Sequence, residues 1–385
     1  MLKTLRHILT LILLVHAPTL AQAPQPNSVR GVWVVRHQLQ DSSSIRKIFE
    51  VARENAFSDL FIQVRGRGDA YYTSNSEPRA EELSGNWDPL AYVLSLKKNY
   101  RVRVHAWVNT FYIWSAERLP RSPMHVLRRH PEWLARPVGA DVLPEDSLKS
   151  RLRNEEGLYL SPLLPEVHDY LLQVYDELLS RYPQLDGLHL DYIRYPGENF
   201  GWHPVGGTQF EKRYYVHPRL LKEDPDAFAR NFGPTGYEIY FSRWGTFLRE
   251  NLSLFVERLA LHVQKTHPNV ILSAAVKPDP TIAHWRFYQE WDYWLDRGWL
   301  DWALPMNYAV DMESFAGRME AIAGVTGNRG IVMGVALYNQ PPEAAIAKVE
   351  RVVSEKLPGV VLFSYDQFIK DSAIRELYRR KILRR

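Results

Sequence analysis

The chain has 385 residues and contains no cysteine. This absence excludes disulfide bonds, catalysis by a thiolate, zinc sites built on cysteine and a lipid-modified N-terminal cysteine. A chain without thiols suits an oxidising compartment, such as a bacterial periplasm or the cell exterior.

An excess of charge of one sign is also missing. The formal net charge is +4, from 48 basic and 44 acidic residues. Removal of the first 21 residues takes away Lys3 and Arg6 and no acidic residue, which leaves +2. This balance does not suit a nucleic-acid-binding protein, so we expect no nucleic-acid partner.

Long hydrophobic runs are scarce, and the one near the N-terminus is short. Lys3 and Arg6 precede an apolar run at 8–15, and small residues follow near Ala21. This pattern predicts a secretory signal peptide at 1–21, and the run is shorter than the roughly 20 residues of a membrane anchor. We expect a short linker at 22–29 and a single domain at 30–385. The mature protein would be periplasmic or secreted, without stable membrane insertion.

Short β-branched runs alternate with helical stretches along the chain. The predicted strands are 31–36, 59–65, 102–109, 187–192, 270–276, 302–307, 331–337 and 360–364. The predicted helices include 42–55, 89–98, 165–182, 237–266 and 343–356. Eight strands separated by helices predict a (β/α)8 TIM barrel. The alternative is a doubly wound sheet, whose nucleotide-binding form would need a glycine-rich turn after the first strand, where the sequence at 35–38 is VRHQ.

Residues within the predicted strands alternate in polarity. In the second strand, Leu60, Ile62 and Val64 lie on the face opposite Gln63 and Arg65. The next two strands show the same alternation. Successive side chains of a strand point to opposite faces, so we expect the apolar set under the helices and the polar set inside the barrel mouth. Long connections at 110–165 and 194–236 should overhang that mouth, where barrel enzymes keep their active sites.

The segment at 186–196, DGLHLDYIRYP, is the strongest candidate for chemistry. Asp191 ends the fourth predicted strand and should face inward beside His189. Arg194 is near enough in sequence to keep the carboxylate ionised. An ionised inward carboxylate suits a nucleophile or a general base of a glycosidase. The alternative is a buried structural salt bridge.

Glycosidases normally need a second carboxyl group. Three aspartates follow later predicted strands, and we rank Asp311 first, Asp279 second and Asp366 third. Each could equally be the N-cap of the next helix, because aspartate is common at that position.

Other side chains at the strand ends are candidates for substrate binding. Arg65 could bind a carboxylate of the substrate or one inside the protein, and aromatic rings could stack on sugars or simply pack in the core. The full set of substrate-binding candidates is Gln63, Arg65, His105, Trp107, Asn109, His189, Arg194, Tyr195, Lys277, Asn307, Tyr308 and Tyr338.

A metal site is the less favoured use of the histidines. His105, His189 and Asp191 should converge at the mouth, but the sequence contains neither a His-Glu-x-x-His motif nor a calcium loop. We expect hydrogen-bonded histidines, no metal and no cofactor.

These segments together resemble the glycosyl hydrolase-like 10 family of bacterial envelope proteins. The resemblance runs from Arg30 to about Asp366, and its landmarks are RGVWV at 30–34, QVR at 63–65, DAYYTS at 69–74, HAWVN at 105–109, LSP at 160–162, DGLHLDY at 186–192 and PMNY at 305–308. It implies a TIM barrel and glycosidase activity on cell-wall or other envelope glycans, with peptide-free peptidoglycan strands as one substrate class. It also implies that Asp191 is the carboxylate of the family at the end of the fourth strand.

Three functions remain open from the sequence. The first is hydrolysis of a β-linked, N-acetylated glycan. The second is glycan binding by a barrel that has lost catalysis, and the third is metal-dependent deacetylation of the same glycans. The position of a second carboxyl group relative to Asp191 separates the first two.

Overall fold

The computed structural model of the chain describes residues 29–137, 140 and 156–383. The predicted signal peptide at 1–21 and most of the linker at 22–29 lie outside the described residues. Among the described residues, no helix combines the length and the apolar character needed to cross a membrane.

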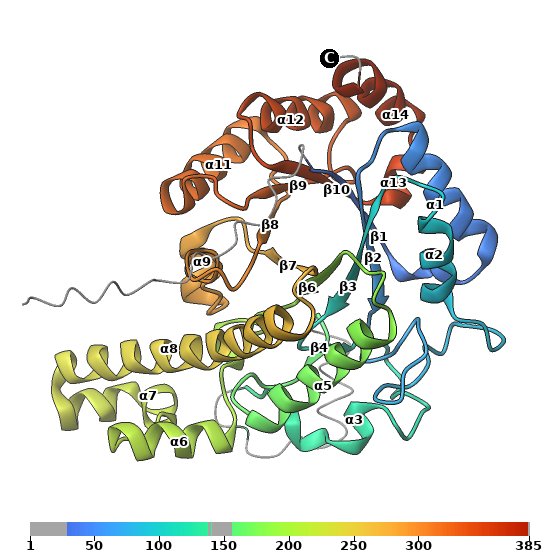
Figure 1. The fold of residues 1–385 in the computed structure, drawn as a ribbon. Helices are drawn as coiled ribbons and strands as arrows, with labels where there is room; N and C mark the ends of the chain where they lie inside the picture. Colours follow the sequence, from blue (N-terminus) through green and yellow to red (C-terminus); the bar gives the residue numbers. More distant parts are fainter. Residues whose placement is uncertain (1–28, 138–139, 141–155, 384–385) are drawn as a thin grey trace, which may run out of the picture.

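Eight parallel strands close into a barrel, which confirms the predicted fold (Figure 1). Around the barrel the strands run in the order β1-β10-β9-β8-β7-β6-β3-β2. Their bounds are β1 Val29–Val34, β2 Asp59–Arg65, β3 Arg103–Asn109, β6 Gly187–Asp191, β7 Ile271–Val276, β8 Trp302–Asn307, β9 Val332–Ala336 and β10 Gly359–Phe363.

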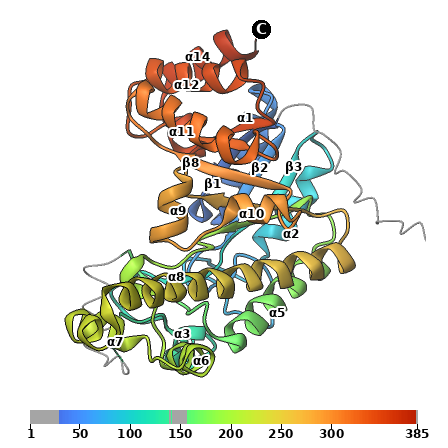
Figure 2. The same ribbon diagram turned by 90° about the vertical axis from the view of Figure 1, so that its left-hand side faces the viewer.

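Helices surround the barrel on its outer side (Figures 1 and 2). Those that cover the strands are α1 Ser42–Glu54, α2 Pro89–Lys97, α5 Pro165–Arg181, α8 Pro225–Thr266, α9 Pro280–Arg286, α10 Trp291–Asp296, α11 Met312–Thr326, α12 Pro342–Ser354, α13 Tyr365–Lys370 and α14 Ser372–Tyr378. Aspartate caps begin several of them, for example Asp41 before α1 and Asp88 before α2. A terminal turn follows at Arg379–Leu383.

The predicted long loop at 194–236 is largely helical, which corrects the sequence interpretation. It contains α6 Pro204–Tyr214, α7 Arg219–Glu223 and the first part of α8. Helix α8 begins at Pro225 rather than at the predicted Tyr237, and Gly233 interrupts it with a positive φ of 76°. Glycine tolerates this backbone conformation, so the two helical parts meet at a kink. The three elements project from the barrel (Figure 2).

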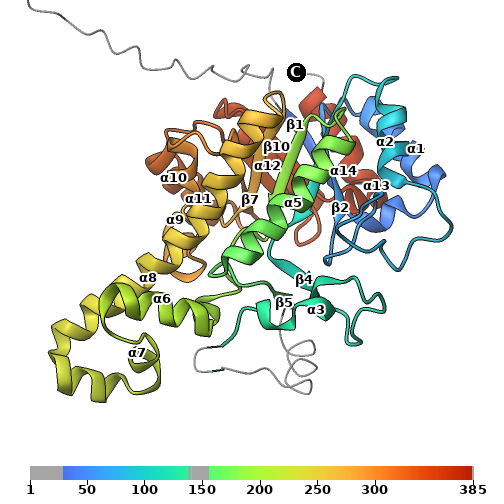
Figure 3. The same cartoon turned by 60° about the horizontal axis from the view of Figure 1, so that its bottom comes forward.

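The connection after β3 carries a small insertion of its own. It contains β4 Tyr112–Trp114, the short helix α3 Val126–Arg129, a turn at Pro131–Trp133 and β5 Leu158–Tyr159, which pairs with β4 in an antiparallel sense. This insertion and α6 lie on the side of the barrel where β3 ends (Figure 3). The insertion and α6 therefore lie over the mouth that the carboxyl ends of the strands form.

Side-chain alternation divides the hydrophobic residues into two layers. Leu60, Ile62 and Val64 belong to the large core cluster that includes the apolar faces of the helices. Phe61 and Trp107 belong to a second cluster together with Trp33, Trp302 and Val361, which fills the barrel interior. The predicted faces are confirmed for these residues, whereas Arg65 at the end of β2 departs from the alternation.

Candidate active site

A cavity of about 440 Å³ lies at the carboxyl ends of the strands. Its lining comes from strand ends around the barrel and from the insertion after β3. The lining residues are Trp33, Val35, Arg36, Gln63, Trp107, Asn109, Tyr112, Glu156, Asp191, Tyr192, Arg194, Ala275, Lys277, Met306, Tyr308, Tyr338 and Phe363.

Asp191 ends β6 and lies in this cavity with 8% of its surface exposed. The indole N–H of Trp107 donates to Oδ2 at 3.2 Å, and the backbone N–H of Tyr192 donates to Oδ1 at 2.7 Å. Tyr192 adopts a positive φ of 50°, a conformation that a bulky residue rarely holds and that often marks functional sites. Both carboxylate oxygens therefore accept hydrogen bonds, which favours the ionised form.

Burial has the larger effect on Asp191. It raises the pKa of the carboxyl group from 3.8 to about 6, against the lowering effects of the Tyr192 N–H, the Arg194 charge and the Trp107 N–H. Arg194 was expected to keep the carboxylate ionised. Its charge does lower the pKa of Asp191, but burial raises that pKa by more. Asp191 exchanges its proton near neutral pH, which suits a group that carries or receives protons in catalysis.

Arg194 pairs with another carboxylate, Glu156, rather than with Asp191. The guanidinium lies 2.9 Å and 3.1 Å from the two Glu156 oxygens, and the hydroxyl of Tyr159 donates to the same carboxylate at 2.7 Å. Burial raises the pKa of Glu156, but Arg194, Tyr159 and Lys277 together lower it below its ordinary value. Glu156 is thus an ionised carboxylate in the same cavity as Asp191.

The remaining polar groups of the cavity form two sets. Arg36 donates to Oε1 of Gln63 at 3.2 Å, and the amide of Gln63 donates to Oδ1 of Asn109 at 3.2 Å. Lys277 follows β7, and burial and the Arg194 charge lower its pKa to about 8. The rings of Trp33, Trp107, Tyr112, Tyr308, Tyr338 and Phe363 supply flat surfaces between these groups.

Eight of the fifteen site residues expected from the sequence line the cavity. These are Asp191, Gln63, Trp107, Asn109, Arg194, Lys277, Tyr308 and Tyr338. The other seven, Arg65, His105, His189, Tyr195, Asn307, Asp279 and Asp311, do not line it, and each has a structural partner elsewhere.

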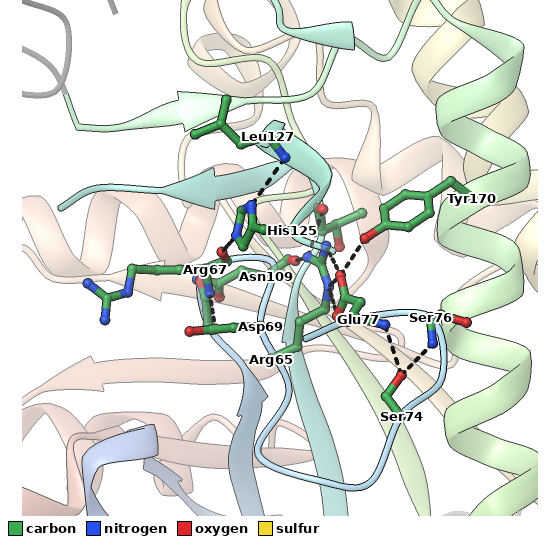
Figure 4. Close-up of polar contacts among 12 residues, drawn as sticks. Arg65, Arg67, Asp69, Ser74, Ser76, Glu77, Asn109, His125, Leu127 and Tyr170 are labelled. Atoms are coloured by element: carbon green, nitrogen blue, oxygen red, sulfur yellow. Dashed lines mark hydrogen bonds and ion pairs between the residues drawn. The ribbon is translucent and has the colours of Figure 1, made fainter. Parts of the chain in front are cut away.

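Arg65 is fully buried and binds a carboxylate inside the protein, the second of its two predicted uses. Its guanidinium pairs with Glu77 at 2.7 Å and donates to the backbone carbonyls of Asn109 and Thr110. Figure 4 shows Arg65, Glu77 and Tyr170 turned toward one another, with the Tyr170 hydroxyl 2.7 Å from Glu77. A register shift between Gln63 and Arg65 in the β2–β3 pairing separates the two side chains, so the simple alternation fails at this point.

The two histidines lie below the cavity in the barrel interior. His105 is fully buried and pairs with Asp59 at 2.8 Å. The indole N–H of Trp33 donates to Nε2 of His189 at 3.0 Å, so Nδ1 carries the proton toward Ser273. Burial, with a smaller effect of His105, lowers the pKa of His189 well below its ordinary range. Both histidines are hydrogen-bonded, as expected, but they do not line the cavity at the mouth, where the sequence placed them.

Tyr195 and Asn307 point away from the cavity. The Tyr195 hydroxyl donates to the carbonyl of Leu248 on α8, and the Asn307 amide donates to the carbonyl of Phe315 on α11. Alternation along β8 explains the second case, because Met306 and its neighbour at 308 face inward and position 307 faces outward.

The aspartates ranked as partners of Asp191 act as caps or pair elsewhere. Asp279 accepts from the Ile282 N–H at 3.0 Å as the N-cap of α9, and Asp311 accepts from Ser314 at 2.7 Å as the N-cap of α11. Asp366 accepts from Gln38 at 2.6 Å and lies 2.7 Å from His37. None of the three lines the cavity.

Sequence reasoning missed Glu156, Arg36, Tyr192 and Trp33. Trp33 was detectable, because it shares the inward face of β1 with Gly31. Glu156 carries no local signal, since it lies in a long connection and is held at the cavity by Arg194 and Tyr159. Within the described part of the chain, no group of three or more acidic or histidine side chains is placed to hold a metal ion.

Comparison with known proteins places this chain in a family. The model of the family described as Glycosyl hydrolase-like 10 matches residues 27–354. The chain belongs to this family. Its curated relatives include the glycosyl hydrolase YngK of Bacillus subtilis, 22% identical over 345 residues, and the glycosyl hydrolase DigH of Escherichia coli, 21% identical over 330 residues.

The chain is shorter than these relatives. The alignments cover 79% of this chain and 59% of YngK, and 75% of this chain and 67% of DigH. Among solved structures, the PgaB (BpsB) glycoside hydrolase domain from Bordetella bronchiseptica is similar, with a TM-score of 0.64, 13% identity and coverage of 92% of this chain and 98% of that domain. The GH42 β-galactosidase Gan42B matches with a TM-score of 0.62, 12% identity and coverage of 92% and 56%. These likenesses show the barrel fold.

The raised pKa of Asp191 predicts a pH-dependent cost to folding. The group binds its proton more tightly in the folded chain than in the unfolded one, so its contribution to stability falls as the pH rises from about 4 to about 6. The wild type should lose about 2 kcal/mol of stability relative to Asp191→Asn between pH 4 and pH 7. Urea unfolding of both proteins across this range measures the change, and a constant difference would contradict the raised pKa.

Proposed function

We propose that the protein is a glycoside hydrolase acting on a bacterial cell-wall or envelope glycan, with Asp191 as nucleophile or base. The observation that carries the proposal is the presence of two carboxyl groups, Asp191 and Glu156, in one aromatic-lined cavity at the barrel mouth. Paired carboxyl groups are the usual machinery of glycoside hydrolysis, and aromatic rings pack well against sugar faces.

The pKa values of the two carboxyl groups are shifted in opposite directions, which supports a division of roles. Asp191 has a pKa raised to about 6 by burial, whereas the Arg194 partner helps to lower the pKa of Glu156 against the effect of burial. Opposite shifts of this kind are typical of catalytic pairs, in which the group with the raised pKa can also serve as the general acid. Above pH 6, the ionised Asp191 can attack the anomeric carbon or take a proton from the attacking water, and the departing sugar oxygen takes a proton from solvent. Glu156 holds Arg194 and contributes negative charge beside an oxocarbenium-like transition state.

The experiment that tests the reaction is product analysis on defined glycans. The wild type is incubated with peptidoglycan strands, both bare and peptide-bearing, and the products are examined by mass spectrometry. Fragments with new reducing ends support hydrolysis, anhydro ends would indicate a lytic enzyme, and the absence of any cleavage would contradict the proposed activity on this substrate.

The pH dependence of kcat/KM tests the role of Asp191. If this carboxylate is the nucleophile or base, activity rises with pH through about 6, because only the ionised form reacts. A limb that falls through about pH 6 would instead identify Asp191 as the general acid. Glu156→Gln measured in parallel should retain the Asp191 limb with reduced kcat.

A glycan-binding protein without catalysis is the second candidate. It is favoured by the position of Asp279 and Asp311, which cap helices instead of facing Asp191. In this case the wild type and Asp191→Asn would bind glycan equally and neither would cleave it. The deacetylase alternative predicts release of acetate that stops on addition of a chelator.

We also propose export of the protein through cleavage of the segment at 1–21. Expression of the full chain in a bacterial host, followed by periplasmic extraction and N-terminal sequencing, tests this. A mature N-terminus after Ala21 supports it, and retention of Met1 in the cytoplasm would contradict it.

A further inference from the structure

The cavity contains a cationic group that the proposed chemistry does not use. Among the described residues, three basic and two acidic side chains line it: Arg36, Arg194, Lys277, Asp191 and Glu156. Arg194 and Glu156 neutralise each other in an ion pair. Arg36 and Lys277 are left with Asp191 alone, so the cavity retains a net positive charge.

Lys277 is the less satisfied of the two remaining cations. Arg36 has an acceptor in Gln63. The ammonium of Lys277 lies over the ring of Phe287, 4.3 Å from its centroid, and none of the described side chains forms an ion pair with it. Among the described residues its ammonium therefore has no hydrogen-bond acceptor, an arrangement that costs free energy unless water or a ligand supplies one.

The position of Lys277 places this cation beside the reacting carboxylate. Lys277 directly follows β7, and β7 pairs with β6, which ends at Asp191. Arg36 follows β1, which is three strands away from β6 around the barrel. A sugar whose linkage lies at Asp191 would thus present one substituent to Lys277, while Trp107 and Tyr308 contact its ring from neighbouring strands.

We infer that Lys277 is a specificity-determining residue that binds a carboxylate carried by the sugar at the cleavage site. The inference rests on the proposed function, since it assigns the charge of the glycan that Asp191 acts on. A carboxylate supplies the missing acceptor and balances the excess positive charge of the cavity. Glycans without an acidic group, or with free amines, would leave Lys277 desolvated and unpaired.

The two sources of such a carboxylate are a lactyl ether, as on peptide-free peptidoglycan strands, and a uronic acid. Binding is measured by calorimetry with Asp191→Asn, and turnover is measured with the wild type. The probes are bare peptidoglycan strands, the same strands with their carboxylates converted to amides, and a uronic-acid oligosaccharide. We expect the acidic strands to bind about 10- to 100-fold more tightly than the amidated strands, the range for a charge-assisted hydrogen bond.

Variants at Lys277 give the decisive comparison. Lys277→Gln should raise KM for the acidic strands about 10- to 100-fold with little change in kcat, and should remove the preference over the amidated strands. Lys277→Arg should restore most of the preference, and Lys265→Gln, an exposed lysine on α8, should behave as wild type.

The outcomes separate the two proposals. Equal binding and equal turnover of acidic and amidated strands, or an unchanged preference in Lys277→Gln, would overturn the role of Lys277 while leaving hydrolysis intact. Selective binding of an acidic probe without any turnover by the wild type would support the carboxylate site and contradict the hydrolase. Tighter binding of the uronic-acid oligosaccharide than of the bare strands would assign the carboxylate to a uronic acid.

Discussion

Asp191→Asn is expected to reduce glycan turnover by about 10²- to 10⁴-fold while glycan binding stays within a few fold of wild type. Asparagine keeps the size of the side chain but cannot act as nucleophile or base. Reducing-end release on glycan strands measures turnover, and calorimetry measures binding. Wild-type turnover in this variant would eliminate Asp191 as the catalytic group.

The matched control for this result is a second aspartate near the barrel mouth. Asp311 caps α11, is exposed and lies outside the cavity lining. Asp311→Asn should keep kcat within a few fold of wild type, because asparagine also serves well as an N-cap. A loss of turnover in Asp311→Asn equal to that in Asp191→Asn would restore Asp311 as the catalytic partner that the sequence ranked first.

Glu77→Gln is expected to destabilise the protein by about 3–5 kcal/mol. Both Glu77 and Arg65 have side chains with no exposed surface, so the variant leaves the guanidinium buried without its counter-charge. Arg65 also donates hydrogen bonds to the backbone carbonyls of residues 109 and 110. The Thr110 N–H in turn donates to the backbone carbonyl of Asp191 at 2.7 Å. Loss of the pair should therefore also lower kcat by loosening the ends of β3 and β6.

Urea unfolding of Glu77→Gln checks the stability, and the exposed pair of Arg329 and Asp296 provides the control. Their side chains are 75% and 53% exposed, so Asp296→Asn should change stability by less than about 1 kcal/mol. A Glu77→Gln variant as stable as Asp296→Asn would show that the buried pair contributes little to folding. It would also remove the argument that this pair holds the active-site strands in place.

The local pattern of the sequence was sufficient to predict the barrel and half of the site. Strand positions follow from β-branched runs, and the inward direction of Trp107, Asn109 and Asp191 follows from strict alternation. Alternation also explains why the prediction for Asn307 was wrong. Asn307 belongs to the set of alternate residues in β8 that faces the helices. It fails at Arg65, where a register shift in the β2–β3 pairing turns the side chain toward Glu77.

The partner of Asp191 could not be found by the same reasoning. Aspartates after strands are visible in the sequence, yet the same position is the preferred place for helix N-caps, and Asp279 and Asp311 take that role. Glu156 lies in a connection with no periodicity, so nothing local marks it. Its place in the cavity results from a long-range ion pair with Arg194.

The sequence by itself thus determined the fold, the family and the position of Asp191 at the barrel mouth. These depend on short-range periodicity and on residues within one strand. Only the tertiary structure decided the protonation of that carboxyl group and the charge around it. Burial depends on every strand that surrounds Asp191, and it outweighs the Arg194 charge to raise the pKa to about 6. The surroundings of Lys277, which has no ion-pair partner among the described residues, are likewise a property of the closed barrel, because the nearby charges come from segments distant in sequence.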